Sequence, residues 1–192
     1  MTRIVGVLGS VTPPGRLSRA LAWALEAARE RDAAVETKLI NLADVRLGFA
    51  DGRPADQLAD DTASVIGELD RADAVLFASP VYRASFTGAL KNLLDLTPID
   101  ALRGKACGII AMGASQHHYL GVDWHLRDVL AWFGAVPLPV SVYLSSADFT
   151  EGELAEAARA ELGELVQALT GLAKALRAAG PLGPTPLAGR RR

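Results

Sequence analysis

The chain has 192 residues, half of them hydrophobic, with 20 Lys and Arg against 22 Asp and Glu. This length suits one domain with a substantial core. The near balance of charge excludes the concentrated basic surface of a nucleic-acid-binding protein, because such proteins gather Lys and Arg on one face. A single cysteine excludes an internal disulfide and the paired-cysteine zinc patterns, and it indicates an intracellular protein.

Apolar runs in the sequence indicate neither export nor a membrane span. Only residues 4–9 separate Arg3 from a polar loop, which is too short for the apolar region of a signal peptide. The longest uncharged run, residues 129–147, approaches membrane-spanning length, but Pro137 and Pro139 interrupt it. We therefore expect a cytoplasmic protein without a transmembrane segment, and we interpret the run as a helix end followed by a buried strand.

Segments with strand and helix periodicity alternate along the chain. The predicted strands are residues 3–8, 35–40, 73–78, 106–112 and 136–143. The predicted helices are about residues 17–28, 58–71, 87–96, 123–133 and 151–178, and residues 44–56 form a loop or an irregular insertion. The third strand is a continuous apolar run, typical of a strand covered on both faces, whereas the second alternates and lies nearer an edge.

This order of elements predicts an α/β fold. Strands that alternate with helices at this spacing need right-handed crossovers and a mainly parallel sheet covered on both faces, which is a three-layer sandwich. We expect one domain over residues 1–179. Residues 180–192 combine Pro and Gly without apolar periodicity, and we expect them to form a disordered tail.

Three polar loops follow predicted strands, and parallel strands present their carboxyl ends at one edge of the sheet, where α/β proteins bind ligands. The first loop, residues 9–18, brings hydroxyls, backbone N–H groups and Arg16 to the start of a helix, which suits a phosphate monoester. The loop has neither the Walker spacing nor the GxGxxG dinucleotide pattern. A plain turn in which Ser18 or a neighbour caps the helix is the alternative interpretation.

The second and third loops also carry polar and aromatic side chains. The second, residues 79–87, holds Tyr82 and Arg83, although Tyr82 is also explained as an aromatic side chain at the edge of the core. The third, residues 113–124, contains two adjacent histidines. Together with His125 they lack metal-ligand spacing on one helix face, so we predict no metal site.

Taken together, the three loops resemble those of the NAD(P)H-dependent FMN reductase family, in particular the small flavin reductases that serve sulfonate monooxygenases. The LGS…S loop and the segment SPVYRASFTGALKNLLDLTP carry most of the similarity, which extends from about residue 3 to residue 142. The resemblance implies a flavodoxin-like, five-stranded parallel sheet in the order 2-1-3-4-5. It also implies FMN at the carboxyl edge of the strands, with NADPH, or alternatively NADH, as the hydride donor.

The same resemblance assigns residues to the flavin. Those that would hold the phosphate are Ser10, Arg16, Ser18 and, as a weaker candidate, Thr12. Those that would lie along the isoalloxazine ring are Pro80, Val81, Tyr82 and Arg83. Those that would border the flavin from the third loop are Gly113, Ala114 and Ser115, with Gln116 and His117 as neighbours. As a cation, Arg83 could also meet a phosphate of the nicotinamide nucleotide.

In function, the resemblance implies an oxidoreductase that reduces FMN and supplies it to a partner monooxygenase. Since hydride passes between two cofactors, no acid, base or metal from the protein is required. Two alternatives stay open. One is an FMN-containing reductase of quinones, azo compounds or other xenobiotics that keeps its flavin. The other is a flavodoxin-like electron carrier, which the near-neutral charge disfavours because carriers dock through strongly acidic surfaces.

One position departs from the family pattern. Trp124 stands where the sulfonate-type reductases carry a tyrosine, in an irregular helix at a subunit interface. The larger ring, with only an N–H to donate, bears on interface geometry and flavin retention. From the family and from the apolar region of Tyr119, Trp124 and Trp132, we expect a homodimer or homotetramer.

Overall fold

The computed structural model describes residues 1–115, 118–180 and 182–186. Its main sheet is parallel, with the strand order β2-β1-β3-β4-β5, and β6 pairs with β4 beyond β5. The strands are β1 (Thr2–Leu8), β2 (Val35–Asn41), β3 (Ala74–Pro80), β4 (Ala106–Met112), β5 (Val136–Pro137) and β6 (Val142–Leu144). The predicted flavodoxin-like order is confirmed.

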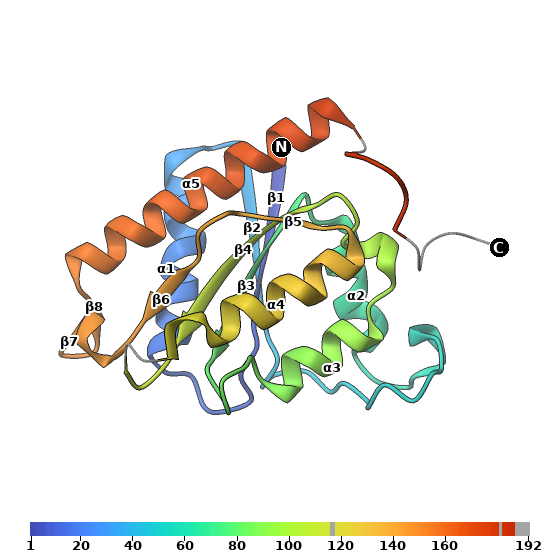
Figure 1. Ribbon diagram of the computed structural model, residues 1–192, viewed down its shortest axis with the longest axis horizontal. Coiled ribbons are helices and arrows are strands. Elements are labelled where there is room, and N and C mark those ends of the chain that lie inside the picture. Colours follow the sequence, from blue (N-terminus) through green and yellow to red (C-terminus); the bar gives the residue numbers. More distant parts are fainter. Residues whose placement is uncertain (116–117, 181, 187–192) are drawn as a thin grey trace.

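Helices cover both faces of this sheet and complete the predicted three layers (Figure 1). One face carries α1 (Arg16–Arg31) and α5 (Glu156–Ala179). The other carries α2 (Thr62–Arg71), α3 (Gly88–Leu96) and α4 (Tyr119–Phe133). Short 3-10 helices span Ala55–Gln57, Ile99–Ala101 and Ser146–Asp148, and a small hairpin consists of β7 (Phe149–Thr150) and β8 (Glu153–Leu154).

The two faces of the sheet follow from the alternation of side chains along each strand. In β1, Ile4 and Leu8 pack against α1 and α5, whereas Val5 and Val7 belong to the opposite core under α2, α3 and α4. Because both sets are buried, β1 has no solvent-facing side, and its sequence is accordingly a nearly continuous apolar run. The carboxyl ends of β1, β3 and β4 therefore meet at one edge, where the three polar loops emerge.

The predicted last strand, residues 136–143, is wrong as a continuous element. Pro137 and Pro139 have no N–H to donate, so the segment leaves the sheet between β5 and β6. Its carbonyls are satisfied from α4 instead, because Arg127 donates to the oxygens of Leu138 (2.6 Å) and Pro139 (3.2 Å). This side chain thus ties α4 to the edge of the sheet.

The other differences concern helix starts. Helices α2, α4 and α5 begin at Thr62, Tyr119 and Glu156 rather than near residues 58, 123 and 151. The β7–β8 hairpin occupies the chain before α5, and the Asp60 carboxylate accepts a hydrogen bond from the Thr62 N–H (2.9 Å) where α2 begins. These boundaries depend on local hydrogen bonds that apolar periodicity does not report.

The end of the chain lies partly outside the described residues, which exclude residue 181 and residues 187–192. The division into a domain over 1–179 and a disordered tail over 180–192 stays a prediction. Within the described ranges, none of the helices combines the length and the apolar character needed to cross a membrane.

Candidate functional site

The first loop presents an open helix N-terminus. Helix α1 begins at Arg16, and its N-cap, Gly15, offers no side chain to its amides. The alternative in which Ser18 caps this helix is therefore wrong. The N–H groups of a helix's first turn have no partner within the helix, so those of α1 stay available to an anion.

Hydroxyl groups surround this helix start. Ser10 is buried, and its Oγ lies 2.8 Å from the Thr12 hydroxyl and 3.3 Å from the Thr12 backbone nitrogen, which donates to it. These bonds fold the loop back on itself in front of α1. Both hydroxyls can still donate to or accept from a bound group, because a hydroxyl carries one donor and two lone pairs.

Arg16 supplies a positive charge at the same place. Its guanidinium lies over the ring of Phe149 in β7, 5.9 Å from the ring centre, in a cation–π arrangement. The first turn of α1 contains no acidic residue. A cation at the positive end of the helix dipole is unfavourable by itself, so this pairing favours occupation by an anion.

A cavity of about 220 Å³ joins the first loop to the second. The predicted site residues that it brings together are Ser10, Thr12, Arg16, Ser18, Pro80 and Tyr82. The volume is below the roughly 300–1,000 Å³ of pockets that enclose whole ligands. It therefore suits the phosphate end of a larger molecule whose remainder lies along the outer loops.

The other predicted residues of the second loop do not line this cavity. Val81 continues the sheet, since its N–H donates to the Met112 carbonyl (2.8 Å), and its side chain packs against the core. Arg83 is exposed at the tip of a tight turn, in which Tyr82 and Ser85 exchange backbone hydrogen bonds of 2.8 and 3.1 Å. Arg83 is thus an exposed neighbour of Tyr82 in the chain and is not part of the cavity lining.

Two buried hydroxyl residues that sequence reasoning did not assign to the site anchor this second loop. The Thr87 hydroxyl accepts from the Leu90 N–H (3.1 Å), capping α3, and donates to the Gly9 carbonyl (2.5 Å) of the first loop. The Thr87 N–H donates to the Ser79 hydroxyl (3.1 Å). The available signal was a threonine directly before the apolar repeat of a helix, which is typical of an N-cap.

The third loop is held by the sheet and by one tyrosine. The Gly113 N–H donates to the Leu144 carbonyl (3.0 Å), and the Tyr143 hydroxyl donates to the Ser115 carbonyl (2.5 Å). Burial raises the pKa of Tyr143, which keeps the phenol protonated as a donor. Gly113, Ala114 and Ser115 are not part of the cavity lining, and the predicted Gln116 and His117 lie outside the described residues.

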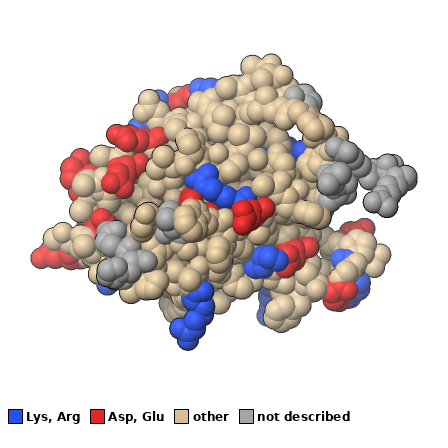
Figure 2. All heavy atoms as spheres, viewed as in Figure 1, with Lys and Arg blue, Asp and Glu red and all other residues tan. Residues whose placement is uncertain are grey.

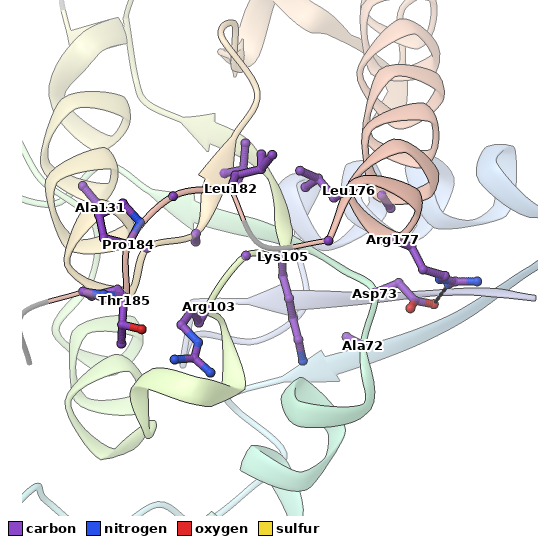
Figure 3. Close-up of a pocket in the computed structure, with 18 residues that line it drawn as sticks. Ala72, Asp73, Arg103, Lys105, Ala131, Leu176, Arg177, Leu182, Pro184 and Thr185 are labelled. Atoms are coloured by element: carbon purple, nitrogen blue, oxygen red, sulfur yellow. Dashed lines mark ion pairs between the residues drawn. The ribbon is translucent and has the colours of Figure 1, made fainter. Parts of the chain in front are cut away.

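A larger cavity, about 750 Å³, lies at the opposite, amino-terminal edge of the sheet and is partly enclosed by residues 182–186. Its charged side chains have partners in the protein. Lys105 donates to the carbonyls of Leu69 (2.8 Å) and Asp70 (2.5 Å), and Arg177 pairs with Asp73. In Figure 3 Lys105 extends away from the chain segment that encloses the cavity, and Arg177 lies beside Asp73. These contacts join helices and strands of the protein to one another.

Comparison with known proteins identifies the family of the chain. The family model described as NADPH-dependent FMN reductase matches residues 2–149. The chain belongs to this family. An NADH-dependent FMN reductase of Pseudomonas putida, SfnF, is 33% identical over 164 residues, covering 85% of this chain and 88% of that protein. An NAD(P)H-dependent FAD/FMN reductase of Geobacillus thermodenitrificans is 38% identical over 117 residues, but the match spans only 63% of its length.

Solved structures agree on the fold of this FMN reductase family member. The apo form of the NADH:FMN oxidoreductase EMOB has a TM-score of 0.78 and 24% identity, covering 100% of this chain and 97% of that one. The family resemblance, the enzyme class NAD(P)H:FMN oxidoreductase and the cofactors FMN and NAD(P)H are thereby confirmed at the level of the family. The residues that bind them in this chain stay a proposal.

The donor set of the first cavity fits FMN. A phosphate monoester needs several donors and positive charge, and the open amides of α1, the hydroxyls of Ser10 and Thr12 and the Arg16 guanidinium supply both. The apolar and aromatic edge formed by Pro80 and Tyr82 suits a flat ring system beside the phosphate.

Proposed function

We propose that this chain transfers hydride from NADPH or NADH to FMN and supplies reduced FMN to a partner flavin-dependent monooxygenase in the cytoplasm. The observation that carries the proposal is the convergence of an open helix N-terminus, Arg16 and hydroxyls on one cavity beside the Tyr82 loop. FMN supplies the redox chemistry when bound, since its ring accepts the hydride. The membership of the chain in the FMN reductase family supports the assignment.

The residues of the chain bind and orient the two cofactors. Ser10, Thr12, Ser18 and Arg16 hold the FMN phosphate, and Pro80 and Tyr82 border the ring. Arg83, exposed at the tip of its turn, meets the pyrophosphate of the nicotinamide nucleotide. Gly113, Ala114 and Ser115 complete the border of the flavin from the third loop. With these roles the protein aligns the nicotinamide and flavin rings, and solvent supplies the proton.

The charge distribution supports an enzyme over an acidic electron carrier. The formal net charge is −2. On the face drawn in Figure 2, basic and acidic side chains are interspersed, and acidic ones gather at one end, near β7, β8 and the start of α5. A carrier that docks electrostatically needs a broader single-sign surface around its cofactor.

The decisive experiment is nicotinamide oxidation by the purified, desalted protein, with NADPH and NADH in parallel, with and without added FMN. We expect turnover that requires added FMN and saturates with it. A yellow protein that oxidises NADPH without added flavin would instead support the quinone or xenobiotic reductase that retains FMN. Flavin binding without any nicotinamide oxidation would support the carrier.

The phosphate site is tested by comparing FMN with riboflavin, which lacks the phosphate. Arg16→Ala and Ser18→Ala should each weaken FMN binding about 10- to 100-fold, as expected for lost charge-assisted contacts, and leave riboflavin binding nearly unchanged. Arg19→Ala is the matched control, since Arg19 is on the same helix but does not line the cavity. Equal losses for both flavins would remove Arg16 and Ser18 from the phosphate site.

Self-association belongs to the same proposal. Three large aromatic side chains of α4 are exposed in the single chain: Tyr119 (53%), Trp124 (61%) and Trp132 (62%). Exposed apolar groups of this size favour burial against another surface. We expect a homodimer or homotetramer through α4, and a monomer in light scattering at micromolar concentration would refute it.

A further inference from the structure

The turn at residues 82–85, called the site turn below, has a backbone that its sequence does not favour. Its central residues, Arg83 and Ala84, have φ of +50° and +61°. A side chain in this left-handed region crowds the backbone, so two-residue turns of this kind normally carry Gly, Asn or Asp. Such a conformation persists only where the surrounding structure holds it.

Helix α4 presses on one side of the site turn. A Cβ placed on Gly121 would lie 2.8 Å from the Ala84 carbonyl oxygen and 3.0 Å from its carbonyl carbon. Only glycine lets the helix approach the backbone of the turn this closely. The contact therefore fixes where the Ala84 peptide lies.

The same helix holds the far end of the turn by a hydrogen bond. His125 Nδ1 lies 3.0 Å from the Ser85 hydroxyl. Gly121 and His125 are four residues apart and so lie on one face of α4. The helix itself is fixed to the sheet, because Arg127 pairs with the Asp123 carboxylate at 2.8 and 2.9 Å while donating to the Leu138 carbonyl.

The chain on either side of the site turn is fixed independently of α4. Val81 is bonded to β4, and Thr87 is bonded to Ser79 and to the first loop. Residues 82–85, between these anchors, make the two close contacts with α4 described above. They include Tyr82, which lines the cavity, and Arg83, the next residue, which is exposed.

We propose that Gly121, Ser85 and His125 are positioning residues, through which α4 holds the site turn in its left-handed form and sets the places of Tyr82 and Arg83 for the nicotinamide nucleotide. This inference rests on the proposed function. The three residues act through the turn and not by direct contact with the flavin, because the cavity lining includes none of them.

The kinetic test uses Gly121→Ala and His125→Ala, with Asp128→Ala as a control on an exposed position of the same helix. The His125 change should raise KM for the nicotinamide nucleotide about 3- to 10-fold, as expected for one lost hydrogen bond, and Gly121→Ala by about 10-fold or more. The Kd of FMN should change less than this KM, because the proposed phosphate contacts come from the first loop and not from the site turn. His125→Asn should restore most of the loss, since its side-chain amide can occupy the position of Nδ1.

A second measurement reports the backbone conformation of the site turn and does not depend on activity. Backbone carbon chemical shifts of selectively labelled Arg83 and Ala84 report φ. We expect them to move towards extended values in Gly121→Ala and His125→Ala and to stay constant in Asp128→Ala. Unchanged shifts, or a KM equal to that of the control, would overturn the proposal. A wild-type protein without nicotinamide oxidation would overturn the proposed function instead, and the shifts would still decide whether α4 holds the turn.

Discussion

The site turn and the turn of the β7–β8 hairpin, residues 150–153, have the same length and different sequences. In the hairpin turn Glu151 and Gly152 have φ of +52° and +87°, and glycine adopts this region without steric cost. The site turn has Ala84 in the position of Gly152, at φ +61°. Both turns have a non-glycine residue at the first central position, but only the hairpin turn has glycine at the second.

This difference indicates where each turn obtains its conformation. The hairpin turn follows the usual preference for glycine in two-residue loops. The site turn depends on Gly121 and His125, which come from a helix far along the chain. Local rules fail most often at functional sites, where surrounding contacts impose a shape that the segment alone would not take. The comparison therefore directs attention to α4 as part of the site.

Removing the Thr87 hydroxyl, which anchors the chain after the site turn, should give the largest difference in stability between matched changes at the two turns. Thr87→Ala deletes the cap of α3 and leaves the buried Gly9 carbonyl without its donor, and it should lower the free energy of unfolding by about 2–3 kcal/mol. The matched change beside the hairpin turn, Thr150→Ala, affects an exposed side chain and should cost less than about 0.5 kcal/mol. Urea unfolding measures both, and equal losses would contradict the anchoring role.

Exchanging alanine and glycine at the second central position of each turn should change the free energy of unfolding in opposite directions. Both changes should be smaller than that of Thr87→Ala. Ala84→Gly relieves the left-handed alanine and should raise the free energy of unfolding by about 0.5–1 kcal/mol, while activity falls several-fold because the turn loosens. Gly152→Ala should lower the free energy of unfolding by about 1 kcal/mol and leave activity unchanged. Thermal unfolding and steady-state kinetics test the pair. A stabilised Ala84→Gly variant with full activity would show that strain in the site turn has no function.

The central sheet could be predicted from the sequence because its signal is local. Strand β4 has the predicted bounds, residues 106–112, since a continuous apolar run ends at Gly113. The predicted last strand, residues 136–143, is wrong as a continuous element, although Pro137 and Pro139 are a visible sign of the interruption. Its carbonyls are satisfied by Arg127, which lies in the preceding helix and gives no sign in the sequence of bonding them.

The candidate site divides in the same way. The convergence of the first-loop residues on one cavity could be predicted, because the hydroxyls, Arg16 and the helix start are contiguous in the sequence. The contact between Ser85 and His125 joins residues 40 positions apart, and the approach of Gly121 to Ala84 is a matter of tertiary packing. A histidine and a glycine in a helix have many ordinary explanations, so only the folded arrangement reveals their common partner.

Substituting the first central residue of each turn should give the smallest stability effect and the sharpest functional contrast. Asn tolerates the left-handed region better than Glu or Arg, so Glu151→Asn and Arg83→Asn should each raise the free energy of unfolding by up to about 0.5 kcal/mol. Glu151→Asn should leave kinetics unchanged. Arg83→Asn keeps the backbone and removes the guanidinium, so KM for NADPH should rise about 3- to 10-fold at constant FMN affinity. An unchanged KM would mean that the site turn positions Tyr82 alone, because the backbone geometry would be preserved and only the cation lost.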